Sequence, residues 1–144
     1  MSDGAAEYEK RLSVLCPVHN IGIAEERLGD NPSDNEILNV LAREGEAIKR
    51  QLPSRSYKIA LCVEGKQISS QELAQLMERL PHEGYSELSF VIGSSHGIDE
   101  SVKAACNMRL SFSRMTFPHQ LMRVILLEQL YRAASINAGS RYHK

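Results

Sequence analysis

The residues best suited to chemistry lie in the last third of the chain, in the run LSFSRMTFPHQLMRVILLEQLYRA from Leu110 to Ala133. This run carries one histidine, His119, directly behind a proline, and the arginines Arg123 and Arg132 further along the same predicted helix. An imidazole can exchange a proton near neutral pH. A guanidinium can hold a phosphate or stabilise a developing negative charge. The run therefore points to proton transfer and to the binding of an anionic partner.

Charge is divided unevenly along the chain. Residues 101–144 carry seven Lys and Arg against one acid, whereas residues 1–100 carry ten against seventeen, so the net charge of -1 conceals a basic C-terminal third. A localised positive field favours a polyanionic partner. The alternative is that these residues form ordinary solvated helix faces. The basic residues are Lys103, Arg109, Arg114, Arg123, Arg132, Arg141 and Lys144.

Length and composition place limits on the class of protein. The 144 residues suit a single domain, residues 1–144. No apolar stretch reaches the roughly 18 residues that span a bilayer, and the start of the chain has no apolar core typical of a signal peptide. We therefore expect a cytoplasmic protein without a membrane span. The three cysteines predict neither a disulfide framework nor a zinc site, and Cys16 with His19 lacks the second ligand pair of a structural metal, so no metal is expected.

Short β-rich runs alternate with helical periods, which predicts an α/β fold with a mostly parallel sheet flanked by helices. We expect strands at Tyr57–Val63, Leu88–Ile92 and Met108–Phe112, and an extended run at Val18–Ile23. Helices are expected over residues 4–12, 36–52, 72–79, 99–106 and 118–136.

Local signals mark where the helices begin. Ser33 or Asp34 can cap the second helix, and Ser69 with Glu72 has the spacing of a capping box. Pro118 suits the first position of the last helix. Apolar residues of that last helix are too many for one narrow stripe, so it should be buried on more than one side, with a partner subunit as the second cover.

Two predicted strands end in glycine-containing loops, at residues 64–66 and Gly93–Gly97, and open α/β sheets bind ligands at such ends. The two glycines of the second loop would let the backbone approach a small molecule. The loop alone is weak evidence, because it has neither the Lys-Ser/Thr of a Walker loop nor the third glycine of a dinucleotide fingerprint. A plain strand-to-helix turn remains the alternative.

A third loop runs from Phe112 to Phe117 and could enclose an adenine ring. Met115 and Phe117 would cover the ring, or both could equally belong to the core. His119 follows in the first turn of the last helix, where the helix dipole disfavours its protonated form. Its alternative role is that of an ordinary surface histidine.

The chain resembles the RlmH family of SPOUT methyltransferases, which methylate 23S ribosomal RNA, in four stretches: IALCVEGKQISS, SFVIGSSHG, LSFSRMTFPHQLMRVILLEQLYRA and the terminal YHK. The resemblance covers nearly the whole chain, and its long C-terminal stretch is the most specific part. It implies a small α/β domain with a C-terminal trefoil knot that works as a homodimer. It further implies S-adenosylmethionine as cofactor and N3 of a pseudouridine in helix 69 of the large-subunit RNA, on assembled ribosomes, as target.

The resemblance also assigns residues by position. Its cofactor contacts fall on Leu61, Gly93, Phe112, Ser113, Arg114, Met115, Thr116 and Phe117. The terminal Tyr142, His143 and Lys144 match a family tail that approaches the active site across the dimer interface. Candidates for the catalytic groups are His119 and His143, as acceptors of the N3 proton, and Arg123. Candidates for holding RNA or the developing anion are Arg114, Arg123, Arg132, Tyr142, His143 and Lys144.

The sequence departs from the family pattern in three places. Family members begin with an additional strand and a Gly-Lys-containing segment, whereas Met1 falls about where their first helix starts. Either the true start lies upstream, or the sheet lacks this strand and the protein tolerates an exposed edge. Cys62 replaces a usual Asp, and Ser94 replaces a common second Gly, which should limit backbone freedom there. The rival interpretation is a knotted dimer that binds RNA or ribosomes without catalysis. An adenine-nucleotide module is less well supported, because no phosphate-cradling loop is present.

Overall fold

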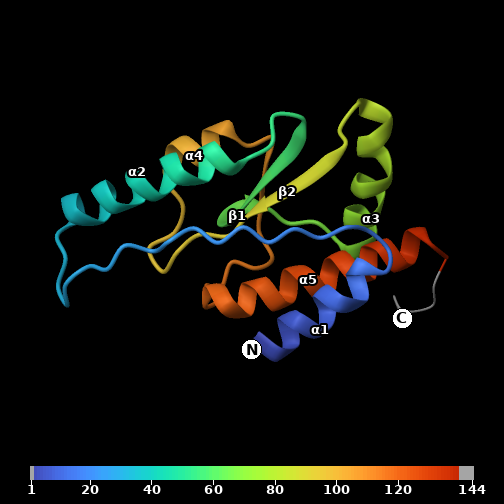
Figure 1. Ribbon diagram of the computed structural model, residues 1–144, viewed down its shortest axis with the longest axis horizontal. Coiled ribbons are helices and arrows are strands. Elements are labelled where there is room, and N and C mark those ends of the chain that lie inside the picture. The colour runs from blue at the N-terminus through green and yellow to red at the C-terminus, as the bar shows by residue number, and fades with distance from the viewer. Residues whose placement is uncertain (1, 140–144) are drawn as a thin grey trace.

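The computed structural model describes residues 2–139 as a three-stranded sheet with helices on both faces (Figure 1). The strands β1 (Ser56–Lys66), β2 (Glu87–Val91) and β3 (Met108–Leu110) are all parallel, in the order β2-β1-β3. A parallel sheet needs cover on both faces, because the connections between its strands place helices there. The α/β class and the parallel sheet predicted from the sequence are thus confirmed, while the trefoil knot stays a prediction.

The helices form two layers, one on each side of the sheet (Figure 1). One layer holds the second and fourth helices, and the other holds the first and last, with the third helix packed against the last. None of the helices formed by residues 2–139 is long and apolar enough to cross a membrane. The helices are α1 (Ser2–Ser13), α2 (Asp34–Gln51), α3 (Ser70–Arg79) with a short 3-10 turn at Leu80–Glu83, α4 (Glu100–Ala105) and α5 (His119–Asn137).

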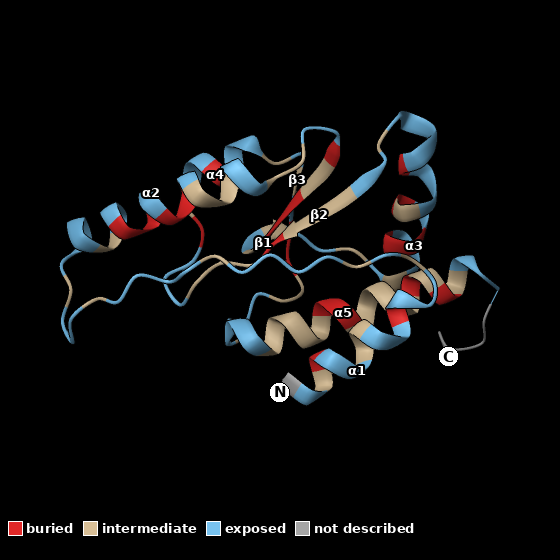
Figure 2. Cartoon of the chain, viewed as in Figure 1, coloured by how far each residue is buried: buried red, intermediate tan, exposed pale blue. Residues whose placement is uncertain are grey.

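The central strand β1 is buried in its middle part (Figure 2). Successive side chains of a strand point to opposite faces of the sheet, so β1 contributes to both layers. Ile59 and Leu61 belong to an apolar cluster with α3 and α5 residues. Ala60, between them, belongs to a second cluster with Val102 of α4. The strand therefore joins two cores, one on each face of the sheet.

We predict that Ile59→Val lowers the free energy of unfolding by about 1 kcal/mol, because Ile59 is fully buried and the change removes one methylene. In a chain of this length that corresponds to a fall of about 3 °C in the melting temperature. Thermal unfolding followed by circular dichroism measures it. Ile21→Val is the control, since Ile21 is 55% exposed and its change should be nearly neutral. Equal effects of the two variants would contradict the assigned core.

Both predicted helix caps are confirmed. The Ser33 hydroxyl accepts from the Glu36 amide at 3.2 Å, and the Glu36 carboxylate accepts from the Ser33 amide, which completes a capping box at α2. Ser69 and Glu72 make the same exchange at α3, with distances of 3.0 and 2.9 Å. The proposed place of Pro118 was wrong by one residue, because it caps α5 and the helix begins at His119.

The last helix is covered from more than one side within this chain. Both α1 and α3 pack on α5, and its buried residues include Leu126, Leu127 and Ala133. The expectation of burial on several sides is therefore confirmed. The second cover, which the sequence assigned to a partner subunit, comes at least in part from α1.

The strand β1 extends further than the sequence predicts, to Lys66 rather than Val63. Leu110 of β3 pairs with Leu61 and again with Lys66, so the chain between these two bulges out of the sheet and returns to the same partner. Gly65 makes the return possible, because a Cβ there would lie 2.6 Å from the backbone N and C of Leu110.

The run Val18–Ile23 is not part of the sheet. Among residues 2–139, no strand precedes Ser56, and β2 pairs only with β1. The outer edge of β2 therefore has no strand beside it in the described part of the chain.

Candidate functional site

The strand register brings the predicted cofactor residues to one end of the sheet. Ala60 lies opposite Val91, and Leu61 lies opposite Leu110. Gly93 lies two residues after Val91, and Phe112 lies two residues after Leu110, so Gly93 and Phe112 lie on either side of Leu61. Ligands of open α/β sheets bind at this carboxyl end. The geometry therefore gathers three segments that sequence reasoning treated as one site.

The turn Gly93–Gly97 needs its two glycines for its own shape. A Cβ on Gly93 would lie 2.5 Å from the carbonyl oxygen of Gly97, and Gly97 has a φ of +97°. The Gly97 amide closes the turn by donating to the Ser94 carbonyl at 2.9 Å. Gly93 is therefore needed for the shape of the turn itself, and its contact with a cofactor stays a prediction.

Ser94 fits the turn without the glycine that is common there in the family. No non-glycine residue among those described has a positive φ, so the serine backbone is unstrained and the expected loss of freedom carries no cost. Its hydroxyl donates to the Glu44 carboxylate of α2 at 3.0 Å. The substitution therefore adds a contact between the turn and α2.

The loop from Phe112 to Phe117 combines a buried start with an exposed middle. Phe112 packs against the core cluster around Ile59, whereas Met115 is 73% exposed. The Ser113 hydroxyl accepts from the Met115 amide at 3.0 Å and so holds the bend between them. Met115 is therefore free to cover a ligand ring, and its alternative assignment to the core is wrong.

His119 and Arg123 lie on the first turns of α5. His119 is exposed at the first position of the helix. Arg123 pairs with Glu9 of α1 at 3.3 Å and remains 43% exposed. Its guanidinium can thus reach an external partner only in competition with α1.

The other arginines assigned to RNA differ in exposure. Arg114 is exposed in the loop before α5. Arg132 forms an ion pair with Glu128, four residues away on the same helix, and their side chains are only 25% and 17% exposed. Arg132 would have to give up its ion pair with Glu128 to bind a phosphate. Arg114 is therefore the better candidate of the two for contacting RNA.

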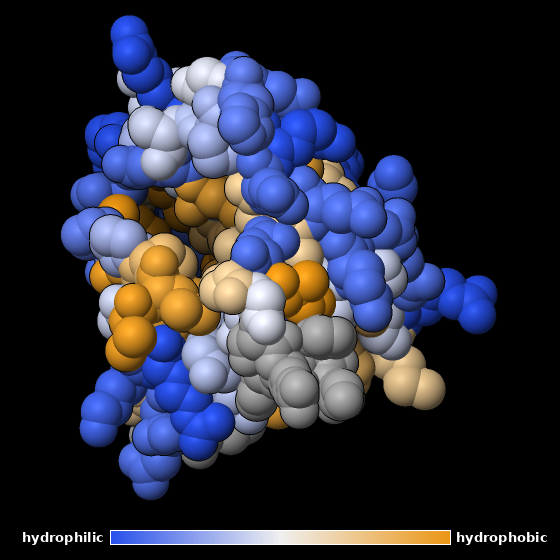
Figure 3. All heavy atoms as spheres, turned by 90° about the vertical axis from the view of Figure 1, so that its right-hand side faces the viewer, coloured by the Kyte–Doolittle hydropathy of each residue, from blue (hydrophilic) through white to orange (hydrophobic). Residues whose placement is uncertain are grey.

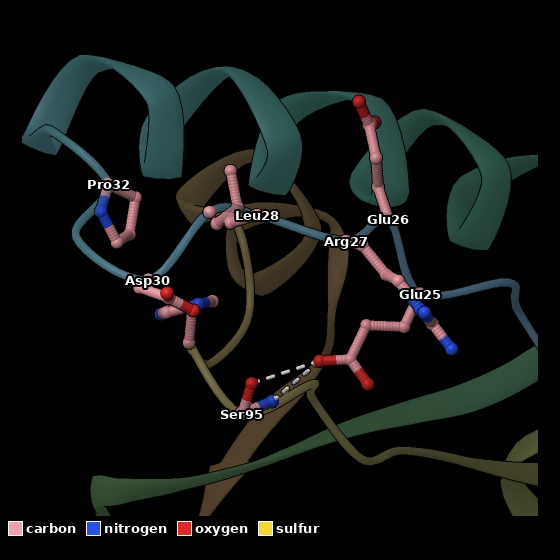
Figure 4. Close-up of a pocket in the computed structure, with 9 residues that line it drawn as sticks. Glu25, Glu26, Arg27, Leu28, Asp30, Pro32 and Ser95 are labelled. Atoms are coloured by element: carbon pink, nitrogen blue, oxygen red, sulfur yellow. Dashed lines mark hydrogen bonds between the residues drawn. The ribbon is translucent and has the colours of Figure 1, made fainter.

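Glu25 is a residue that sequence reasoning missed. It lies in the loop between α1 and α2 and points toward the Gly93–Gly97 turn (Figure 4), where its carboxylate accepts from the Ser95 hydroxyl at 2.9 Å and from the Ser95 amide at 3.4 Å. The Ser95 hydroxyl and then its amide lower the pKa of Glu25, with smaller contributions from His119 and His96. The carboxylate therefore ties the loop between α1 and α2 to the turn. No local pattern around Glu25 could have signalled this.

An open cavity lies between residues 25–32 and the tip of the turn at Ser95 and His96 (Figure 4). Its lining carries charges of both signs, including Arg27 and Asp30. Neither Leu61 nor the loop 112–117 lines it. The cavity thus borders the predicted cofactor site on the side of Glu25.

Cys62, which replaces the usual Asp, carries no charge beside this edge of the sheet. Burial, and then the Glu64 carboxylate, raises the pKa of its thiol. The nearby Glu64 is itself paired with Lys103 at 2.6 Å. The substitution therefore removes a negative charge, as expected.

The remaining assignments fall outside what the structure describes or concern metals. Tyr142, His143 and Lys144 lie beyond the described residues. Within residues 2–139, no group of three or more His, Cys, Asp or Glu side chains could hold a metal ion.

Comparison with known proteins identifies the family. A family model described as "Predicted SPOUT methyltransferase" matches residues 1–143. A protein of Streptococcus equi subsp. zooepidemicus named "Ribosomal RNA large subunit methyltransferase H" is 46% identical over all 144 residues, which cover 91% of its length. Proteins of the same name from Leuconostoc mesenteroides and Streptococcus thermophilus are each 44% identical over the same shares. With the α/β fold and the gathered loops, these matches show that the chain belongs to the SPOUT methyltransferase family.

Proposed function

We propose that this chain transfers a methyl group from S-adenosylmethionine to N3 of a pseudouridine in helix 69 of 23S ribosomal RNA, on assembled ribosomes in the cytoplasm. The observation that carries the proposal is the similarity, over the full chain, to proteins named for methylation of large-subunit ribosomal RNA. The converging loops at the carboxyl end of the sheet support it, since they lie where such a reaction needs its cofactor.

The residues at this edge suit S-adenosylmethionine. The turn after β2 and the loop 112–117 lie on either side of Leu61, and the exposed Met115 of that loop can cover an adenine ring. The cofactor has no phosphate, so the lack of a phosphate loop in the sequence does not count against it. When bound, it supplies a methyl group that its sulfonium centre already activates. Leu61, Gly93 and the loop 112–117 are the residues that would hold it.

The chain has to align N3 with the methyl group and accept its proton. His119 is the described candidate for the acceptor, because it is exposed at the first position of α5. His143 remains the second candidate acceptor.

A homodimer would cover apolar surface that a single chain leaves exposed. Val14 and Leu15, just after α1, are 84% and 43% exposed. Apolar side chains gather around a hollow on the end of the molecule seen in Figure 3. Most residues of α5 outside its buried core are only partly covered. These features favour a second copy of the chain as partner.

The rival function is a non-catalytic dimer that binds RNA or ribosomes. The exposed Arg114 in the loop before α5 would serve this function equally well, because a guanidinium can hold a phosphate without any methyl transfer. Transfer of labelled methyl from S-adenosylmethionine to ribosomes that lack the helix 69 methylation separates the two functions. Label in the 23S RNA supports the enzyme, whereas ribosome binding without label supports the rival.

We predict that removing Tyr142 to Lys144 leaves the dimer intact and lowers methyl transfer about tenfold, because one basic contact and one candidate proton acceptor are lost. Size-exclusion chromatography and the ribosome assay measure the two effects. Truncation of the terminal lysine alone is the control for a simple loss of charge. Unchanged turnover without the three residues would refute the role of the tail.

A further inference from the structure

The turn Gly93–Gly97 is held by two glutamates from different parts of the chain. Glu44 of α2 accepts from the Ser94 hydroxyl at 3.0 Å. Glu25 of the loop before α2 accepts from the Ser95 hydroxyl at 2.9 Å. Two consecutive serines are thus each bound by a carboxylate, one from each side of the turn.

Glu44 is an unusual choice for a residue that only stabilises the fold. It is buried, at a relative exposure of 8%. Within the described part of the chain, no donor reaches its second oxygen, Oε2. A buried carboxylate loses more hydration than one hydrogen bond restores, and an apolar residue would stabilise this position better. The role of Glu44 therefore lies in its hydrogen bond with the Ser94 hydroxyl rather than in stabilising the fold.

The backbone of the turn is already closed by its own contacts. The Gly97 amide donates to the Ser94 carbonyl at 2.9 Å, and Gly93 packs directly on Gly97. The turn does not need either glutamate to form. What the glutamates add is a fixed orientation of the turn relative to α2 and to the loop that precedes α2.

We propose that Glu44 and Glu25 are positioning residues for methyl transfer, which orient the turn after β2 so that it receives the cofactor. This rests on the proposed function, since it assigns a role within the same cofactor site. Glu44 acts from the buried side through Ser94. Glu25 acts from the solvent side through Ser95.

The test uses serine variants that remove one hydroxyl and leave both glutamates in place. Ser94→Ala should raise the dissociation constant for S-adenosylmethionine about tenfold and Ser95→Ala about threefold, because each loses a hydrogen bond to a carboxylate of different burial. Turnover on ribosomes at saturating cofactor should stay within about twofold of wild type, since the reacting groups are unchanged. Ser13→Ala is the control, because its hydroxyl donates to the Glu9 carbonyl of its own helix, α1, and makes no contact with the turn among the described residues.

Variants of Glu44 separate positioning from bulk stability. Glu44→Gln keeps an oxygen that accepts from Ser94 and should bind the cofactor nearly as wild type does, whereas Glu44→Ala should match Ser94→Ala. In the Ser94→Ala background, Glu44→Gln should have no further effect. The inference would be overturned if Ser94→Ala bound S-adenosylmethionine as tightly as wild type does. It would also be overturned if affinity, turnover and melting temperature all fell together. Either result would leave the proposed function standing. A wild-type chain that binds no S-adenosylmethionine would overturn both.

Discussion

Gly65→Ala is expected to lower the free energy of unfolding by about 3 kcal/mol, because a methyl group at this position has no room. Its Cβ would lie 2.6 Å from two backbone atoms of Leu110 and 2.7 Å from one of Arg109. Real Cβ contacts are essentially never this short, and the obstacle is backbone of a paired strand rather than a flexible side chain. The strands β1 and β3 would have to separate where Leu110 pairs with Lys66.

Thermal unfolding followed by circular dichroism measures the effect as a fall of about 10 °C in the melting temperature. Gly29→Ala is the matched control, since no described residue lies within 4 Å of its added methyl group and its φ is not positive. Alanine there should be neutral or slightly stabilising. If Gly65→Ala and Gly29→Ala have the same melting temperature, β1 does not pair again with β3 at Lys66 as described.

The helix starts could be predicted from the sequence because their signals are local. Ser33 and Glu36 are three residues apart, and that spacing alone determines the reciprocal hydrogen bonds of the capping box. The same holds for Ser69 and Glu72. Strand ends are different. The extension of β1 to Lys66 depends on pairing with Leu110, which is more than forty residues away. The residues next to Gly65 in the sequence give no indication that Leu110 packs against it.

The candidate site was predictable in part, for a related reason. Loops that follow parallel strands meet at one edge of a sheet, so the order of strands and loops along the chain is enough to place Gly93 and Phe112 together. Glu25 and Glu44 could not be placed in this way. One lies in a loop without periodicity, and the other is one of several acidic residues on α2 whose burial depends on how that helix docks.

Charge was the least informative of the sequence signals for single residues. The basic C-terminal third favours a polyanionic partner, but Arg123 and Arg132 are each paired with a glutamate in the folded chain. Pairing of this kind depends on contacts between helices or on burial, which a count of charges cannot show. The overall field can persist while individual arginines serve the fold.

Arg123→Ala is expected to lower kcat/KM for methyl transfer to ribosomes about a hundredfold, if its guanidinium stabilises the anion formed as N3 loses its proton. Arg123 lies one helical turn after His119 and is 43% exposed, so it can approach a base held at the start of α5. Its present partner, Glu9, does not compete strongly, because an ion pair exposed to this degree contributes at most about 1 kcal/mol.

Glu9→Gln distinguishes this role from a structural one. It removes the negative charge that Arg123 contacts on α1 and leaves the guanidinium in place. If Arg123 acts on the substrate, Glu9→Gln should keep wild-type turnover within about twofold. If Arg123 only fastens α1 to α5, the two variants should lose the same activity and the same melting temperature, and Arg123 would then have no part in the reaction.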